Sequence, residues 1–144
     1  MKHLVIALLA VLVTGCASPK YGVYTAIDTA NGARLAIDAS NVLPRVYSPS
    51  ETRFNVRQEA SDNFGNTLIH LLRQKGYAVA ESPQFWRTFS SPSAVSGFSF
   101  NYVIDQVSDD QTRLTLMVED RTISRMYRIV NGAVTPVGFW VKKD

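Results

Sequence analysis

The stretch that decides the fold is DNFGNTLIHLLRQKG, residues 62–76. Its apolar residues share one face at helical spacing; they are Phe64, Leu68, Leu71 and Leu72. This pattern predicts an amphipathic helix from Asp62 to Lys75. Ser61 or Asp62 can accept hydrogen bonds from the free N–H groups of the first turn, and Gly76 can take the left-handed conformation that ends a helix. We expect this helix to be the stability nucleus of the domain.

The elements on either side of this helix follow from the same reasoning. Tyr77–Glu81 indicates a short strand after it, and Thr52–Gln58 alternates apolar and polar residues like a half-buried strand before it. Further upstream, one helical stripe is made of Leu35, Ala39, Val42 and Leu43. We therefore predict a second helix over residues 29–43, which Gly32 weakens at its start and Pro44 ends.

The C-terminal part of the chain predicts four strands joined by short turns. Apolar and polar residues alternate in Phe98–Asp105, Leu114–Glu119, Thr122–Ile129 and Val134–Val141. Asn131-Gly132 is a strong hairpin signal, because both residues tolerate positive φ. Pro136 indicates an edge strand or a bulge, and Arg125 interrupts an otherwise apolar strand face. Phe98, Phe100 and Tyr102 are expected to lie in the core.

Together these elements predict a single α+β domain over residues 29–144. Their order favours two helices packed on one face of a mainly antiparallel sheet of five to six strands. Hydrophobic residues make up 46% of the 144 residues and charged residues 19%, a composition typical of a globular chain. The basic residues are scattered, whereas nucleic-acid binding needs a contiguous basic stripe. We therefore expect no direct nucleic-acid partner.

The N-terminus predicts an exported lipoprotein. A basic start precedes the apolar run Leu4–Val13, which is too short to span about 30 Å of hydrocarbon and is typical of a signal peptide. Val13-Thr14-Gly15-Cys16 resembles the lipobox of bacterial lipoproteins, so we expect residues 1–15 to be removed and Cys16 to be acylated. The alternative is an ordinary signal peptide with a chance cysteine. Loss of Lys2 with the signal leaves a formal charge of +2 rather than +3.

Residues 16–28 are interpreted as a tether between lipid and domain. Tyr21, Val23 and Tyr24 exceed what a spacer needs, and tyrosine is a frequent interface anchor. We expect this segment to dock on a neighbouring subunit as an added strand, with Tyr21 and Val23 on one face. The alternative is an unstructured linker whose tyrosines rest near lipid headgroups. Phe85 and Trp86, in the long loop 82–97, are a second partner-binding candidate or the core of a folded-back loop.

The sequence shows no catalytic or metal-binding constellation. His70 is the one histidine of the exported chain and is predicted on the solvent side of its helix. Without a second histidine or a free cysteine, a zinc site or a Cys–His nucleophilic pair has no partners. Carboxylates for a cell-wall hydrolase would be Glu81, Asp105, Glu119 and Asp120. These can pair only through tertiary placement, so we expect no enzyme, no metal and no cofactor.

Several stretches resemble one family. They are Pro49–Phe54, Asp62–Gly65, Leu71–Val79, Ser124–Tyr127, Gly132 and Pro136–Lys143. These stretches, the lipobox and the chain length look like the TrbH conjugal transfer lipoproteins. The helix–strand pattern also resembles the small N-terminal domain of secretins, a ring-forming module.

The TrbH resemblance implies a structural component of a type IV secretion system that moves plasmid DNA between cells. The implied place is the outer-membrane core complex, beside VirB-like partners of the TrbG and TrbI type, with a homo-oligomeric ring among the implied assemblies. Only the lipidated residue, Cys16, carries over from the family. Ala17 follows it in place of an inner-membrane retention Asp, which predicts attachment to the periplasmic face of the outer membrane. The alternative is a lipoprotein of another envelope machine.

Overall fold

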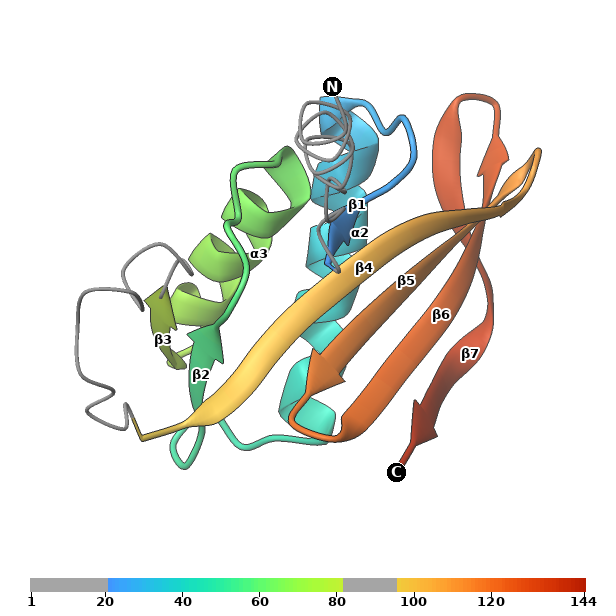
Figure 1. Ribbon diagram of the computed structural model, residues 1–144. Helices are drawn as coiled ribbons and strands as arrows, with labels where there is room; N and C mark the ends of the chain where they lie inside the picture. Colours follow the sequence, from blue (N-terminus) through green and yellow to red (C-terminus); the bar gives the residue numbers. More distant parts are fainter. Residues whose placement is uncertain (1–20, 82–95) are drawn as a thin grey trace, which may run out of the picture.

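The computed structural model describes residues 21–81 and 96–144. Within these residues two helices pack on one face of a seven-stranded sheet (Figure 1). The helices are α2 (Thr29–Val42) and α3 (Asn63–Gln74), with a 3₁₀ turn, η2 (Leu43–Arg45), after α2. The strands are β1 (Gly22–Val23), β2 (Arg53–Val56), β3 (Ala78–Glu81), β4 (Phe98–Ser108), β5 (Gln111–Val118), β6 (Arg121–Val130) and β7 (Ala133–Lys143). The α+β prediction is confirmed.

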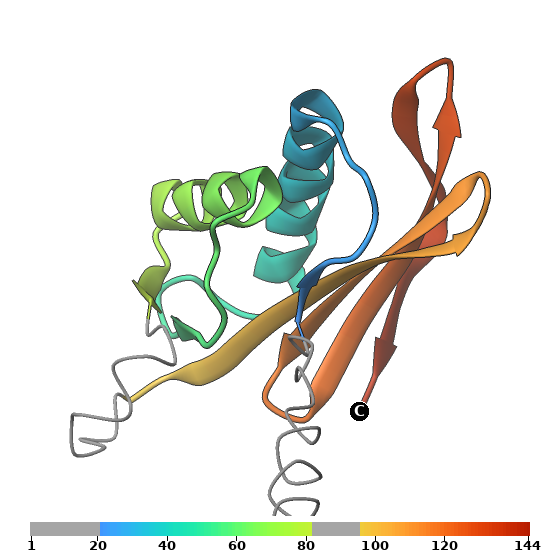
Figure 2. The same cartoon turned by 45° about the horizontal axis from the view of Figure 1, so that its top comes forward.

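The sheet has a parallel part and a larger antiparallel part. Its strand order is β3-β2-β4-β5-β6-β7, with β1 paired to β4 beside β2. The unit β2–α3–β3 is a parallel crossover, whereas β4 to β7 form an antiparallel meander of long strands. In the turned view both helices lie on one side of this meander (Figure 2). Because β1 belongs to the sheet, the described fold starts before the boundary expected at residue 29.

Helix α3 forms as predicted, with one change in its buried face. The Asp62 Oδ1 accepts a hydrogen bond from the Gly65 amide at 2.8 Å, and Gly76 takes a φ of +89° after the last turn. Leu68 and Leu72 are fully buried. Ile69 is buried as well while Leu71 is only half-buried, since α3 packs against α2 as well as the sheet.

Helix α2 begins at the predicted residue and ends at Val42, one residue before the predicted end. The Asp28 Oδ1 accepts from the Asn31 amide at 2.8 Å and caps the helix start. The α-helix thus ends before Pro44, as predicted, and the chain continues as the single 3₁₀ turn η2, where the missing N–H of a first-turn proline costs nothing. At Gly32 an added Cβ would lie 3.0 Å from the Asn63 side-chain nitrogen, so this glycine lets α2 approach the start of α3.

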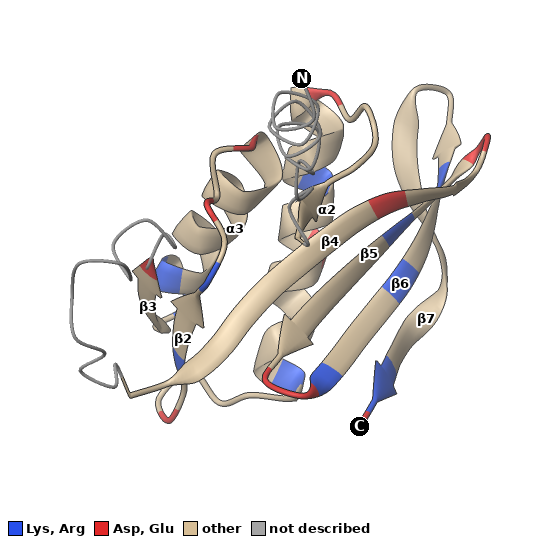
Figure 3. Cartoon of the chain, in the orientation of Figure 1, with Lys and Arg blue, Asp and Glu red and all other residues tan. Residues whose placement is uncertain are grey.

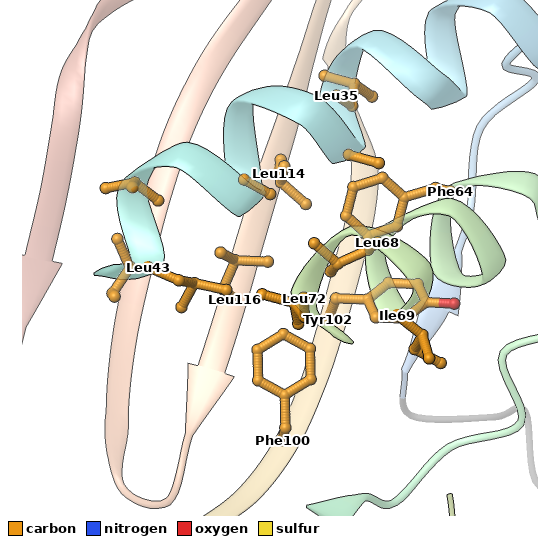
Figure 4. Packing of buried hydrophobic residues seen from close by; sticks show 14 of the residues in the cluster. Leu35, Leu43, Phe64, Leu68, Ile69, Leu72, Phe100, Tyr102, Leu114 and Leu116 are labelled. Carbon is orange, nitrogen blue, oxygen red and sulfur yellow. The ribbon is translucent and has the colours of Figure 1, made fainter. Parts of the chain in front are cut away.

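The core lies between the helices and the sheet and is rich in aromatic rings. Phe54 on β2 stands 5.0 Å from Tyr77 and 5.1 Å from Phe100, measured between ring centroids. Leucines from both helices meet those of β5 in the same layer (Figure 4). Phe98 corrects the prediction of a core residue, because 42% of it is exposed at the end of β4 beside Tyr47.

The hairpin of β6 and β7 forms at the predicted turn. Asn131 and Gly132 both have positive φ, 51° and 76°, which matches the right-handed twist of the flanking strands. Pro136 lies on β7, which is an edge strand of the described sheet. The pairing breaks between Ser124 and Met126 of β6, so a bulge follows Pro136 as well.

Candidate functional site

The described residues contain no group of three or more His, Cys, Asp or Glu side chains that could hold a metal ion. Three of the carboxylates considered for hydrolysis, Asp105, Glu81 and Glu119, are each held by other groups, and Asp105 and Glu119 lie far apart. Asp105 pairs with Arg113 on β5, and Glu81 pairs with Arg73 at 2.8 Å. Glu119 accepts from the amide of Ser99, six residues or about 20 Å along β4 from Asp105. His70 is exposed, as predicted, and contacts Gln74.

The segment from Tyr21 to Tyr24 is extended and lies on the chain's own sheet. Gly22 and Val23 pair in parallel with Val103 and Ile104, and the Tyr24 amide donates to the Ile104 carbonyl at 2.8 Å. The Val23 side chain packs against the core. The strand expected to join a neighbouring subunit therefore joins β4 of the same chain, and Tyr24 is the more exposed of the two tyrosines. Cys16, Phe85 and Trp86 lie outside the described residues.

Two tyrosine–aspartate pairs fasten the helices to the sheet. The Tyr102 hydroxyl donates to Asp62 at the start of α3, and the Tyr127 hydroxyl donates to Asp38 of α2 at 2.6 Å. Burial, together with these hydrogen bonds, raises the pKa of both tyrosines well above the ordinary value. Both hydroxyls therefore stay protonated and act as donors even at alkaline pH where a free tyrosine ionises.

Gly65 makes the first of these pairs sterically feasible. A Cβ added at Gly65 would lie only 2.1 Å from the Tyr102 hydroxyl oxygen. This contact was not predicted from the sequence. The available signal was a glycine within the first turns of an otherwise strong helix, where a buried glycine often marks the close approach of another group.

Arg125, interpreted from sequence as an interruption, is the centre of a hydrogen-bond network. Its Nη1 lies 3.0 Å from Asp38 Oδ2, while its Nε and Nη2 donate to the Gly138 carbonyl at 3.1 and 2.8 Å. Gly138 has a φ of +72° and lies in the β7 bulge. The Arg125 and Asp38 side chains are only 20% and 27% exposed. This network connects α2, β6 and the bulge, and it places an arginine on the helix-facing side of the sheet.

Beside this network a groove of about 350 Å³ opens between the end of α2 and strand β7. We call it the C-terminal groove. It is lined by Val42, Arg45, Val46, Ile123, Arg125, Phe139, Trp140 and Lys142. Lys and Arg appear at the end of β7 and at the end of α2 (Figure 3). Apolar side chains and three cations thus line the groove together, and Phe139 is 91% exposed.

The family follows from comparison with known proteins. A family model described as conjugal transfer protein TrbH matches residues 18–144. The chain belongs to the TrbH family. No curated protein sequence and no solved structure matches this TrbH chain. The resemblance inferred from sequence is confirmed, and two of the stretches that carried it, Ser124–Tyr127 and Pro136–Lys143, are neighbouring parts of β6 and β7 beside the C-terminal groove.

TrbH proteins are conjugal transfer components, so this chain takes part in a conjugal transfer system. Among residues 21–81 and 96–144, no helix is both long and apolar enough to cross a membrane.

Proposed function

We propose that this TrbH protein is a non-enzymatic outer-membrane lipoprotein that acts as a structural component of the core complex of a type IV secretion system. The observation that carries the proposal is the family match, which begins at residue 18, two residues after the lipobox cysteine. The described domain supports it, because its polar networks fasten helices to the sheet and three exposed apolar residues, Val137, Phe139 and Val141, lie on the edge strand β7.

Part of the expected tether, residues 16–28, already belongs to the described sheet. Gly22 is already paired with Val103 of the sheet, so five residues, 17–21, lie between Cys16 and the described sheet. The six Cα–Cα steps from Cys16 to Gly22 reach about 20 Å at most. An acyl chain on Cys16 would therefore hold the domain against the periplasmic face of the membrane, and two or more acyl chains anchor a protein stably.

The partners in this proposal are outer-membrane core proteins of the TrbG and TrbI type. Tyr24 is exposed beside β4, and Tyr21 and Val23 precede it. This segment remains a candidate contact even though its main chain pairs with β4 of the same chain. Phe85 and Trp86 remain candidates as aromatic residues of the loop 82–97. A homo-oligomeric ring and the likeness to the secretin N-terminal domain stay part of the same proposal.

The test uses a conjugating host that lacks its own copy of the gene. Wild-type protein should restore plasmid transfer, incorporate labelled palmitate and float with outer membranes, whereas Cys16→Ser should lose the label and the membrane attachment. Tyr24→Ser leaves the core residue Val23 in place and should lower recovery of core-complex proteins, while His70→Ala serves as an exposed control. Membrane attachment and transfer that survive Cys16→Ser would refute the lipoprotein role.

A further inference from the structure

We propose that the C-terminal groove binds a segment of a partner protein in which an aromatic or large aliphatic side chain stands beside a carboxylate. The inference specifies the chemistry of a partner contact and rests on the proposed role as an assembly component. It concerns a surface separate from Cys16, the Tyr21–Tyr24 segment and the loop 82–97.

The apolar part of the groove is suited to one large side chain. Val42 and Ile123 are buried and form the inner wall, whereas Val46 and Phe139 are exposed at the mouth. An aromatic ring that is 91% exposed leaves nearly its whole apolar area in water, and burial of that area favours association. A groove that is apolar with a few convergent polar groups is the usual form of a binding site.

The rim of the groove is positive. Arg45 makes no ion pair or side-chain hydrogen bond with any described residue, and Lys142 pairs only with Asp144, at 3.1 Å and largely exposed. An exposed pair of this kind contributes little and exchanges readily for another carboxylate. Arg125 is already neutralised by Asp38. Arg45 and Lys142 are therefore the two cations that a carboxylate of a partner would meet.

The shape of the groove is fixed before any partner binds. Three residues of β7, Gly138 to Trp140, stand opposite the single residue Arg125 of β6. In a regular strand neighbouring side chains point to opposite faces, but the bulge lets Phe139 and Trp140 both line the groove. Arg125 holds the bulge through the Gly138 carbonyl. A preformed groove avoids the cost of ordering on binding.

Recognition here depends on side chains, because the outer edge of β7 is poorly suited to strand addition. Counting from the two-residue turn, Tyr127 and Pro136 form a non-hydrogen-bonded pair, so the missing N–H of Pro136 lies on the open edge. The bulge disrupts the edge further on, and both features are known protections against sheet extension. The groove is also concave, which favours an inserted side chain over a lipid surface.

The test selects ligands for the purified full-length chain from phage-displayed random peptides about a dozen residues long. The enriched peptides should place Phe, Trp, Tyr or Leu beside Asp or Glu. Phe139→Ser and Arg45→Glu should each weaken their binding at least about tenfold, as loss of an interface anchor does. Ile129→Ser and Arg34→Glu change an exposed apolar residue and an exposed cation elsewhere and should bind normally. Circular dichroism checks that all four variants fold.

Several outcomes would overturn the inference. Enriched peptides that lack acidic residues, or that bind Phe139→Ser as well as wild type, would do so. The inference would also be overturned if no peptide were selected and Phe139 were needed only for binding to phosphatidylglycerol–phosphatidylethanolamine vesicles. The same holds if no peptide were selected and Phe139 were needed only for self-association, measured by sedimentation. Groove variants should keep the Cys16 palmitate label. Wild-type protein that takes up no palmitate label in its host but binds the selected peptides would leave the groove site standing and refute only the lipoprotein role.

Discussion

Gly65 is the residue at which local preference and tertiary contact disagree most clearly. Helix propensity alone would favour alanine there by about 1 kcal/mol. The packing demands the opposite, because the space for a Cβ is taken by the Tyr102 hydroxyl. We expect Gly65→Ala to lower the free energy of unfolding by about 1–3 kcal/mol, the usual cost of overpacking, measured by urea denaturation.

A second variant separates this clash from other effects. Tyr102→Phe removes the hydroxyl that a Cβ at position 65 would strike, so Gly65→Ala should cost less in that background. Equal costs in both backgrounds, or a stabilising Gly65→Ala, would contradict the contact between Gly65 and Tyr102.

Buried tyrosines predict sensitivity to alkaline pH. Burial raises the pKa of Tyr77 to about 12, while its hydroxyl donates to the Tyr47 carbonyl at 2.6 Å. In the unfolded chain tyrosines ionise near pH 10. The contribution of Tyr77 to stability is therefore complete below about pH 10 and is lost as the pH rises toward 12.

This pH dependence is measured by urea denaturation at a series of values from about pH 8 to pH 11. Stability of the wild type should fall above about pH 10. Tyr77→Phe should be less stable at neutral pH, because it loses the hydrogen bond to Tyr47, but its stability should fall less steeply at high pH. Parallel curves for the two proteins would show that Tyr77 does not titrate abnormally.

At the scale of elements, helix α3 is expected to dominate stability. Leu68 and Leu72 are fully buried between α2 and the sheet, so Leu→Ala at either position should cost about 2–5 kcal/mol. His70 lies on the exposed face of the same helix. His70→Ala should therefore change the denaturation midpoint very little, and comparable losses at His70 and Leu68 would mean that the helix face is assigned incorrectly.

The β7 bulge should depend on Arg125. Arg125→Met keeps the length of the side chain but removes its bonds to Asp38 and Gly138. We expect a loss of about 1–3 kcal/mol and faster amide exchange in β7. The control is Arg128→Met, because its pair with Asp110 is 49% and 57% exposed and such pairs contribute little. Unchanged exchange in β7 would show that Arg125 does not hold the bulge.

The elements that sequence predicted well are those with local signals. The start of α3 at Asp62, the cap at Gly76 and the turn at Asn131-Gly132 each depend on neighbours within a few residues. The segment of β1 was predicted as a strand but on a neighbouring subunit, because its pairing partner in the same chain lies about 80 positions away. The position of β2 between the parallel strands β3 and β4 also depends on residues far from it in the sequence.

The candidate site was predictable only in part. The importance of Ser124–Tyr127 and Pro136–Lys143 came from resemblance, but their meeting in one groove depends on the register of β6 and β7. Arg125 on a strand face gave no indication of its partner, since Asp38 is on a helix 87 positions away. One sequence alone does not show which carboxylate on another element will pair with a given arginine.

At the scale of the whole molecule, the folded unit is expected to need the residues before α2. A chain that begins at Asp28 keeps the helix cap but loses β1 and the half-buried side chains of Val23 and Ile27. We expect it to be less stable than a chain beginning at Tyr21 by about 1–3 kcal/mol, from the apolar area returned to water. Equal denaturation midpoints for the two chains would show that β1 is not part of the stable domain.

For the exported lipoprotein that we propose, the pairing of β1 with β4 would also set an order of events during export. A chain that crosses the inner membrane from its N-terminus presents Gly22 and Val23 long before Val103 and Ile104, with which they pair. Until about seven tenths of the chain has emerged, β1 has no strand to join. In this proposal, the enzymes that cleave the signal peptide and attach lipid would act before β1 has a strand to pair with. The closing of the sheet over β1 would then be among the last steps of folding, after the modification is complete.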